Sequence, residues 1–372
     1  MTLRVALVAG PMYDHLYEVL EPYDVRVDVH ADHPTLNARV AQLLESGERL
    51  DLISTHSKYA PSQRRWLRPL DDVLAAGMLD RLAPGAVELC RFEGSLLCIP
   101  RLIDVRVMWV RVDRVEHVPD TWAEVDSTGL VFGFTGRESG LFGLFFELVI
   151  GAGGRLFTDD AQPVIESTEA EHAVETIVRL AQRAPDDLVG WHYDDVDAAL
   201  LDGRVDAAAA WPGGWGPISR SALADVLRPY PYPAGAERRV SYSGCHAWAI
   251  PTTCGDLVGA ASLLAELSGR DAQLVDALGG NMSANLDALA SVEPVDETDR
   301  RRLEITRTTI ENSMITYPSL EHFPTIETAG WTAINGAIRG ILSPLEAIRD
   351  IQRAASDHSR SNSSQSASGT AT

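Results

Sequence analysis

The first sixty residues alternate apolar strand-like runs with helical segments, and this order limits the folds that the chain can adopt. The apolar runs are 3–9, 25–29 and 50–54, and the helical segments between them are 14–20 and 37–48. A strand–helix–strand–helix–strand order is typical of a mostly parallel, doubly wound sheet. The sequence therefore predicts an α/β fold.

Polar loops follow the first and the third of these predicted strands. In doubly wound sheets, ligands contact the loops at the carboxyl ends of the strands. We therefore expect residues 10–13 and 56–59 to form one wall of a ligand-binding cleft. The candidate residues on this wall are Tyr13, His56, Ser57 and Tyr59.

Two longer strands are predicted further along the chain. Residues 101–113 are mostly apolar but contain Asp104 and Arg106, and residues 242–251 form a second long run. A long strand with charged residues in its interior often passes between domains. We interpret the first run as a crossing between two domains and the second as the return crossing.

Residues 196–216 combine a short helix, a turn and an alanine-rich run that ends in two tryptophans. The tiny side chains at 205–210 indicate a strand that is buried on both faces. The segment WPGGW (211–215) then presents two indole rings beside glycines. An indole face packs well on the C–H face of a sugar, so one interpretation is a cleft wall. The other is a tight turn whose two tryptophans fill the core.

Length, charge and hydropathy limit the size, the partners and the location that this chain can have. The 372 residues suffice for two domains or for one large bilobed domain. The formal net charge of −21 disfavours nucleic acids and anionic membranes, because their phosphates would be repelled. No apolar run reaches the roughly 18 residues of a membrane span. The N-terminus also lacks the pattern of a secretion signal.

Sequence motifs for catalysis and metal binding are missing. There is no P-loop, GxSxG, HExxH or DxDxDG pattern. The four cysteines form neither a CxxC pair nor a spacing suited to zinc. We therefore expect no catalytic residues, no metal and no cofactor. The alternative is an enzyme that uses Cys245 beside His246, although adjacent residues of a strand point to opposite faces.

Several segments are informative because of the order in which they occur. They are Asp51-Leu52-Ile53, RFEGSLLCIPRLIDVRVMWVRVD (91–113), PDTWAEV (119–125), IGAGGRLFTDD (150–160), ALLDGRVDAAAAWPGGWG (199–216), SGCHAWAIP (243–251) and WTAINGAIRGILSPLEAI (331–348). Together they resemble the extracellular solute-binding proteins of ABC sugar importers, the group that includes maltose-binding protein. The segment between Trp122 and Val131 departs from the family, because it is shorter than the usual full helix.

The resemblance implies a bilobed periplasmic-binding-protein fold of type II, with two doubly wound α/β lobes joined by a hinge. Lobe 1 is expected to comprise residues 1–107 and 248–305, and lobe 2 residues 108–247 and 306–355. The polar, low-complexity residues 356–372 are predicted to be a disordered tail.

The resemblance also implies which residues hold the ligand. Besides the first wall, the candidates are Trp211, Gly213, Gly214, Trp215, Arg137, Glu138, Ser139, Tyr242, His246 and Trp248. Asp104 and Arg106 are placed at the hinge, where a structural ion pair between them is the alternative. For Lys58, the only lysine, the alternatives are a clamp with Arg137 for an acidic ligand and a solvated loop charge.

The implied function is capture of a carbohydrate, from mono- to oligosaccharide, between lobes that close about a hinge. The implied partners are the transmembrane subunits of an ABC importer, and we expect a monomer that binds no nucleic acid. The alternatives are a cytoplasmic binding or sensing protein and, less favoured, an enzyme recruited from the fold. We expect the extracellular face of the membrane if a signal is missing from this chain, and the cytoplasm if its start is genuine.

Overall fold

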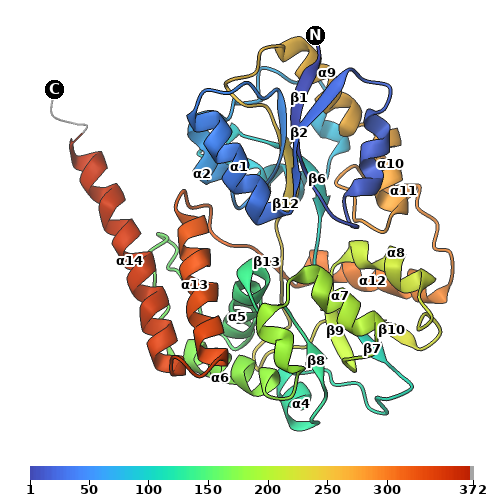
Figure 1. Ribbon diagram of the computed structural model, residues 1–372, viewed down its shortest axis with the longest axis vertical. Helices are drawn as coiled ribbons and strands as arrows, with labels where there is room; N and C mark the ends of the chain where they lie inside the picture. The colour runs from blue at the N-terminus through green and yellow to red at the C-terminus, as the bar shows by residue number, and fades with distance from the viewer. Residues whose placement is uncertain (369–372) are drawn as a thin grey trace.

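Each half of the protein is built around its own sheet, and the two halves are stacked along the long axis (Figure 1). The structure is a computed structural model that describes residues 1–368, with side chains as far as Asp357. Buried apolar side chains form two separate clusters, one for each sheet. The protein therefore has two lobes, each with its own core.

The first lobe contains a five-stranded sheet in the order β2-β1-β3-β12-β6. Its strands are β1 (Leu3–Val8), β2 (Val25–Ala31), β3 (Leu52–His56), β6 (Ile99–Ile103) and β12 (Cys245–Ala249). The first three strands are parallel, as their alternation with helices predicts. β12 runs antiparallel to both of its neighbours.

Helices and one hairpin cover this sheet. They are η1 (Asp14–Leu20), α1 (His33–Glu45), α2 (Ala60–Gln63), η2 (Arg64–Trp66), η3 (Leu79–Arg81), α3 (Pro84–Leu89), β4 (Arg91–Phe92), β5 (Ser95–Leu96), α9 (Leu257–Leu267), α10 (Arg270–Leu278) and α11 (Leu286–Ala290). α1 begins four residues before the predicted start, because the Asp32 side chain accepts a hydrogen bond from the Thr35 N–H at 2.9 Å and caps the helix. No α-helix forms over 66–79, since Pro69 interrupts that segment and 3₁₀ turns lie only at its two ends.

The second lobe contains a four-stranded sheet in the order β10-β7-β9-β8. Its strands are β7 (Val107–Arg111), β8 (Phe132–Gly133), β9 (Ala207–Ala210) and β10 (Leu227–Tyr230). β9 consists of four alanines, and it lies between β7 and β8 in the interior of the sheet. Three of these alanines are buried, so the predicted alanine strand is confirmed.

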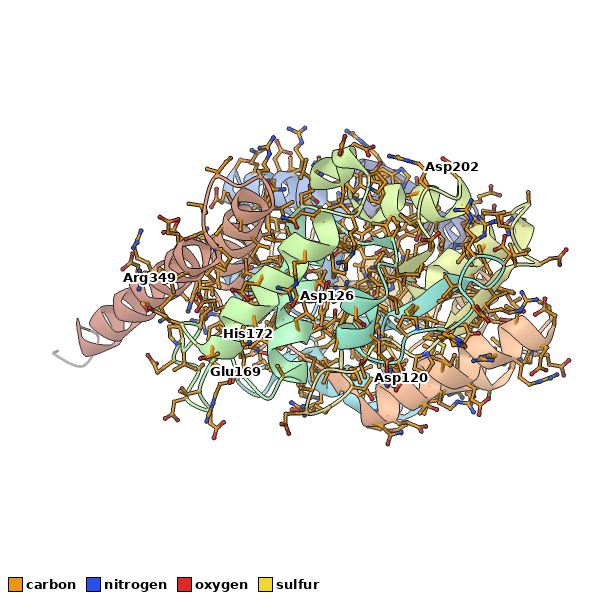
Figure 2. All side chains as sticks on the ribbon, turned by 90° about the horizontal axis from the view of Figure 1, so that it is seen from below. Asp120, Asp126, Glu169, His172, Asp202 and Arg349 are labelled. Carbon is orange, nitrogen blue, oxygen red and sulfur yellow. The ribbon has the colours of Figure 1, made fainter. Side chains whose placement is uncertain are left out.

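A larger set of helices surrounds the second sheet. They are α4 (Trp122–Ser127), α5 (Glu138–Gly151), α6 (Thr168–Ala181), η4 (Asp186–Gly190), α7 (Tyr193–Leu201), η5 (Pro212–Gly214), α8 (Trp215–Arg220), α12 (Glu297–Asn312), α13 (Phe323–Ile338) and α14 (Pro344–Ser368). The segment that departs from the family is α4, a helix of six residues with a Thr121–Glu124 capping box. Asp126 ties α4 to α6 by accepting from Arg179 at 2.8 Å, on the outer face shown in Figure 2.

The predicted crossing strands are both broken where they pass between the lobes. Residues 101–113 form β6 in the first sheet and β7 in the second, with Asp104, Val105 and Arg106 between them. The return run forms β11 (Ser241–Tyr242), which pairs with β13 (Met314–Ile315), and then β12. Residues 104–106 and 243–244 belong to neither sheet, so each run is interrupted at the boundary.

The lobe boundaries and the tail differ from those expected. β12 places residues 245–247 in the first sheet, and α12 packs against β10 and β7 of the second. Residues 356–368, expected to be disordered, belong to α14, and 369–372 lie outside the described residues. Within residues 1–368, every helix is too short or too polar to cross a membrane.

A buried ion pair anchors the first lobe next to the boundary. Arg101 donates to the two carboxylate oxygens of Asp276 at 2.8 and 2.9 Å, and Asn281 donates to the same carboxylate at 2.9 Å. Burial raises the pKa of Asp276, but the charge and hydrogen bonds of Arg101 outweigh it and leave that pKa well below its ordinary value. Arg101 also donates to the Tyr13 carbonyl at 3.2 Å, so the pair positions a residue of the predicted cleft wall.

The substitution Asp276→Asn is expected to lower the free energy of unfolding at neutral pH by about 3–5 kcal/mol, because Arg101 would stay buried without a counter-charge. The depressed pKa of Asp276 means that its carboxylate stabilises the fold above the unfolded-state pKa of about 4, and that this contribution is lost as the pH falls towards the folded-state pKa. Urea unfolding at neutral pH and near pH 3 should therefore show a smaller difference between wild type and variant at the lower pH. Asp72→Asn, at an exposed position, is the control. Identical unfolding curves for the two variants would contradict the prediction.

Candidate ligand-binding cleft

A cavity of about 310 Å³ lies between the two lobes and is lined by residues of both. The first lobe contributes the loops after β1, β2 and β3, and the second contributes α7, the start of α5 and the segment after β9. The hinge residue Asp104 also lines it. The loops at strand ends therefore meet at one cavity, as expected for doubly wound sheets.

Most of the predicted site residues line this cavity. They are Tyr13, His56, Tyr59, Ser139, Trp211, Gly213, Gly214, Tyr242 and His246. They come from segments up to 233 residues apart, such as Tyr13 and His246, whose side chains lie 3.2 Å apart. The structure thus brings the two predicted walls together.

Of the two tryptophans of the WPGGW segment, only Trp211 lines the cavity. Trp215 begins α8 and stacks on Trp109, with 5.9 Å between the ring centroids, in the core of the second lobe. Trp248 packs in the first lobe's core, edge-on to Tyr17 at 6.3 Å. The placement of Trp215 and Trp248 at the cleft is therefore wrong, because both rings fill cores instead.

Three polar candidates also lie away from the cavity lining. The Ser57 hydroxyl accepts from the Cys245 N–H at 3.0 Å and joins β3 to β12. Arg137 donates to the Gly190 carbonyl at 2.9 Å, and Glu138 pairs with Arg137 and with His192, at 2.9 Å each. These side chains stabilise the segments around the cavity and do not form its surface.

The wall contributed by the second lobe is aromatic. Tyr242 meets Trp211 edge-to-face at 5.5 Å, and Tyr193 lies 6.1 Å from Trp211 between ring centroids. The Tyr193 hydroxyl is 2.8 Å from that of Ser139. Arg106 does not reach the cavity but lies behind this wall, 5.3 Å from the Trp211 ring and 4.9 Å from the Tyr242 ring.

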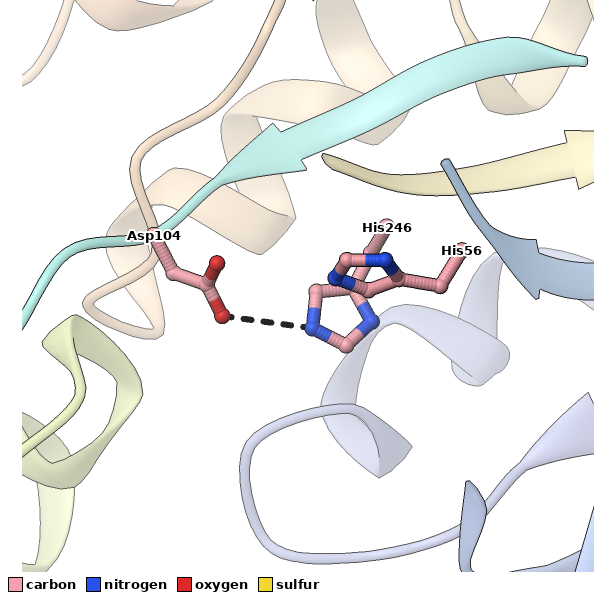
Figure 3. A group of neighbouring side chains, drawn as sticks. All are labelled: His56, Asp104 and His246. Carbon is pink, nitrogen blue, oxygen red and sulfur yellow. Dashed lines mark hydrogen bonds and ion pairs between the residues drawn. The ribbon is translucent and has the colours of Figure 1, made fainter. Parts of the chain in front are cut away.

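The wall contributed by the first lobe contains three histidines. His33 Nε2 lies 2.9 Å from His246 Nδ1, and His246 Nε2 lies 3.2 Å from Asp104 Oδ2. The rings of His56 and His246 are 4.9 Å apart (Figure 3). Burial, followed by the neighbouring His246, lowers the pKa of His33 and of His56 well below the ordinary value, so both are neutral at pH 7.

Several cavity residues were missed, among them His33, Tyr193 and Asp197. His33 follows β2, so its loop belongs to the same sheet edge as the two loops that were considered. Tyr193 begins α7, and Asp194, Asp195 and Asp197 follow it in the same helix. Asp195 does cap α7 by accepting from the His192 N–H at 2.7 Å, but Asp197 lines the cavity. Burial, with a smaller effect of Asp194, raises the pKa of Asp197 to about 7.

The charged residues Asp104, Arg106 and Lys58 each have a partner other than the one expected from the sequence. Asp104 and Arg106 do not pair with each other. Arg106 instead lies 3.4 Å from Glu147, and Asp104 contacts His246. Lys58 is neither solvated nor part of a clamp with Arg137. Its ammonium group pairs with the buried Glu327 of α13 at 2.7 Å.

Glu327 connects the two lobes across the boundary. One carboxylate oxygen accepts from Lys58 at 2.7 Å and the other from the Tyr59 hydroxyl at 2.8 Å. Lys58 and Tyr59 belong to the turn between β3 and α2 of the first lobe, whereas Glu327 belongs to the second lobe. Only 10% of the Lys58 side chain is exposed to solvent, so this contact is largely shielded from water. We call this contact the interlobe latch.

No family model matches the sequence. Among solved structures, maltose-bound MalE3 of T. maritima is 20% identical, with 95% of this chain and 99% of that chain covered and a TM-score of 0.84. An ABC transporter solute-binding protein of Thermotoga lettingae with α-D-tagatose is 20% identical over 95% and 98% of the two chains, with a TM-score of 0.82. One of Agrobacterium radiobacter with ribitol is 17% identical over 96% and 98%, with a TM-score of 0.85. The chain therefore has the bilobed type II periplasmic-binding-protein fold, as predicted.

The substitution Glu327→Gln is expected to loosen the interlobe latch, because the charge partner of Lys58 is lost. A change of about 1.4 kcal/mol in the closing equilibrium would raise the open population tenfold. Lys58 is the only lysine, so its acetylation by an amine reagent, followed by mass spectrometry, reports on the latch. Small-angle X-ray scattering should show a larger radius of gyration in the same variant. Glu45→Gln, which removes an exposed pair with Arg65, is the control. Equal acetylation rates and radii in both variants would refute the role of the latch.

Proposed function

We propose that this protein captures a carbohydrate between its lobes and delivers it to the membrane subunits of an ABC importer. The observation that supports this most directly is the pairing of two different walls around one interlobe cavity. Trp211, Tyr193 and Tyr242 offer flat apolar faces on one side, and the first lobe offers imidazole, hydroxyl and carboxylate groups on the other. A sugar has both kinds of surface, with C–H faces that pack on rings and hydroxyls that need hydrogen-bond partners.

The charge of the cavity favours a neutral ligand rich in hydroxyl groups. Asp104 and Asp194 line it, together with Asp197, whose pKa of about 7 leaves it partly ionised. The nearby cations Lys58 and Arg106 already have the carboxylate partners Glu327 and Glu147. An anionic ligand would therefore be repelled. The proteins of the same fold described above are named for maltose, tagatose and ribitol, which are uncharged polyols and sugars. The cavity volume of about 310 Å³ is at the small end for ligand pockets, which favours a mono- or disaccharide.

Closure of the lobes is the proposed mechanism of capture. A ligand that contacts both walls stabilises the closed form over the open one and shifts the equilibrium between them. Bending would occur where the chain crosses the boundary, at 104–106, 243–244 and 291–296. The closed monomer would then be the form that the importer subunits recognise, on the side of the membrane from which solute enters.

A binding role also fits the environment of the one candidate nucleophile. Cys245 is fully buried in the core of the first lobe, whereas His246 lines the cavity. The two side chains therefore cannot act together on a ligand, as their adjacent positions in a strand predict. We accordingly propose that the protein binds its ligand without chemical conversion.

The substitution Trp211→Ala is expected to weaken sugar binding about 10–100-fold, the usual effect of removing a central aromatic contact. Calorimetric titrations with maltose, tagatose and ribitol would identify a ligand for the wild type and then measure the loss. Trp66→Ala is the matched control, because Trp66 lies outside the cavity and stacks with Arg65. If no sugar or polyol binds the wild type, the proposed function fails; if Trp211→Ala binds as well as Trp66→Ala, the assignment of the wall fails.

The substitution Gly213→Val is expected to weaken the same binding by obstructing closure. A Cβ atom at Gly213 would lie 2.3 Å from Cγ of Met12 and 2.9 Å from Oδ1 of Asn281, both in the first lobe. The lobes would have to separate to make room for it, while each core stays intact. Gly190→Ala is the control, since nothing lies within 4 Å of its Cβ position. Unchanged affinity in Gly213→Val would show that the lobes need not approach this closely.

A further inference from the structure

Three potential metal ligands from distant parts of the chain meet on one side of the cavity. They are His56 at the end of β3, Asp104 in the first crossing and His246 in β12 (Figure 3). Each can offer one ligand atom, and these atoms all lie within 4.8 Å of one another. The three residues are 7%, 6% and 5% exposed, so this is a buried cluster.

We propose that His56, Asp104 and His246 bind a divalent transition-metal ion, with zinc as the expected occupant. Two imidazoles and one carboxylate form a ligand set that zinc accepts in tetrahedral sites. Imidazole nitrogen favours zinc and its neighbours over calcium or magnesium, which prefer oxygen ligands. The local spacing of Cys and His in the sequence could not reveal this set, because its members are 48 and 142 residues apart.

The observed distances are close to those that a metal needs. With bonds of 2.0–2.1 Å, two donors of a tetrahedral zinc ion lie about 3.3 Å apart. His246 Nε2 and Asp104 Oδ2 are already 3.2 Å apart. The third ligand atom, within 4.8 Å of both, would have to move by roughly 1–1.5 Å to complete the set. The His56 ring would have to make this movement towards the other two ligands.

The surroundings orient the His246 ring but set a cost at two of the ligands. The Tyr13 hydroxyl lies 3.2 Å from His246 Nε2 and would lose this contact on coordination. A ligating histidine usually has a second hydrogen bond that orients its ring, and His246 Nδ1 has one with His33 Nε2 at 2.9 Å. His56 Nδ1 accepts from the Lys58 N–H at 3.2 Å, and coordination by His56 would give up this long bond. All three ligands line the cavity, so the fourth position would open into it and take a water molecule or a ligand hydroxyl. The site does not depend on the proposed sugar.

The test uses the full chain after treatment with EDTA and dialysis. Titration with ZnCl₂ in a calorimeter should show one ion per chain, and CoCl₂ should produce the visible absorption bands of four-coordinate cobalt. Since even groups that only orient a ligand are worth about 10–100-fold in affinity, His246→Ala and His56→Gln should each weaken zinc binding by at least about 100-fold. Asp104→Asn keeps the shape of the side chain and should also abolish the cobalt bands.

The matched control is His172→Ala, because His172 is an exposed histidine on the far side of the second lobe (Figure 2). It should bind both ions as the wild type does. Circular dichroism and urea unfolding identify any variant that has lost its fold. The proposal is overturned if the wild type binds no zinc, if Asp104→Asn binds like His172→Ala, or if His172→Ala loses binding.

Discussion

Charged side chains are buried where the chain passes between the lobes, and each has a partner from another segment. Asp104 lies 3.2 Å from His246 of the return crossing, and Arg106 lies 3.4 Å from Glu147 of α5. Removing Glu147 would leave the buried Arg106 charge uncompensated, at a cost of about 3–5 kcal/mol. These partners therefore hold the two crossings in register, and they also place Asp104 at the cavity.

The two sides of the cavity have different chemistry because different elements supply them. The first lobe presents loops at the ends of parallel strands, where polar groups such as His33 and His56 gather. The second presents rings, and Arg106 lies behind Trp211 and Tyr242 at cation–π distance. Neither wall encloses a ligand alone. Contacts such as Lys58 with Glu327 join the two lobes beside the cavity.

Much of the fold could be predicted because the signals were local. The strands and helices of the first sixty residues follow from periodicity, and tiny side chains identified β9 as an interior strand. The cavity residues at strand ends followed from the order of those elements. The two indoles could not be assigned in the same way. They are four residues apart, but η5 and the start of α8 turn Trp215 onto Trp109, whereas Trp211 stays at the cavity.

The sequence by itself determined the α/β class, the two crossings and the set of polar strand ends, because hydrophobic period and turn residues act over short distances. Only the tertiary structure decided which charged groups pair and which side chains share the cavity. Lys58 finds its carboxylate 269 residues away in Glu327, and His246 meets His33 and Asp104 from two other segments. Such contacts depend on how two independently twisted sheets are joined, and no local pattern records that geometry.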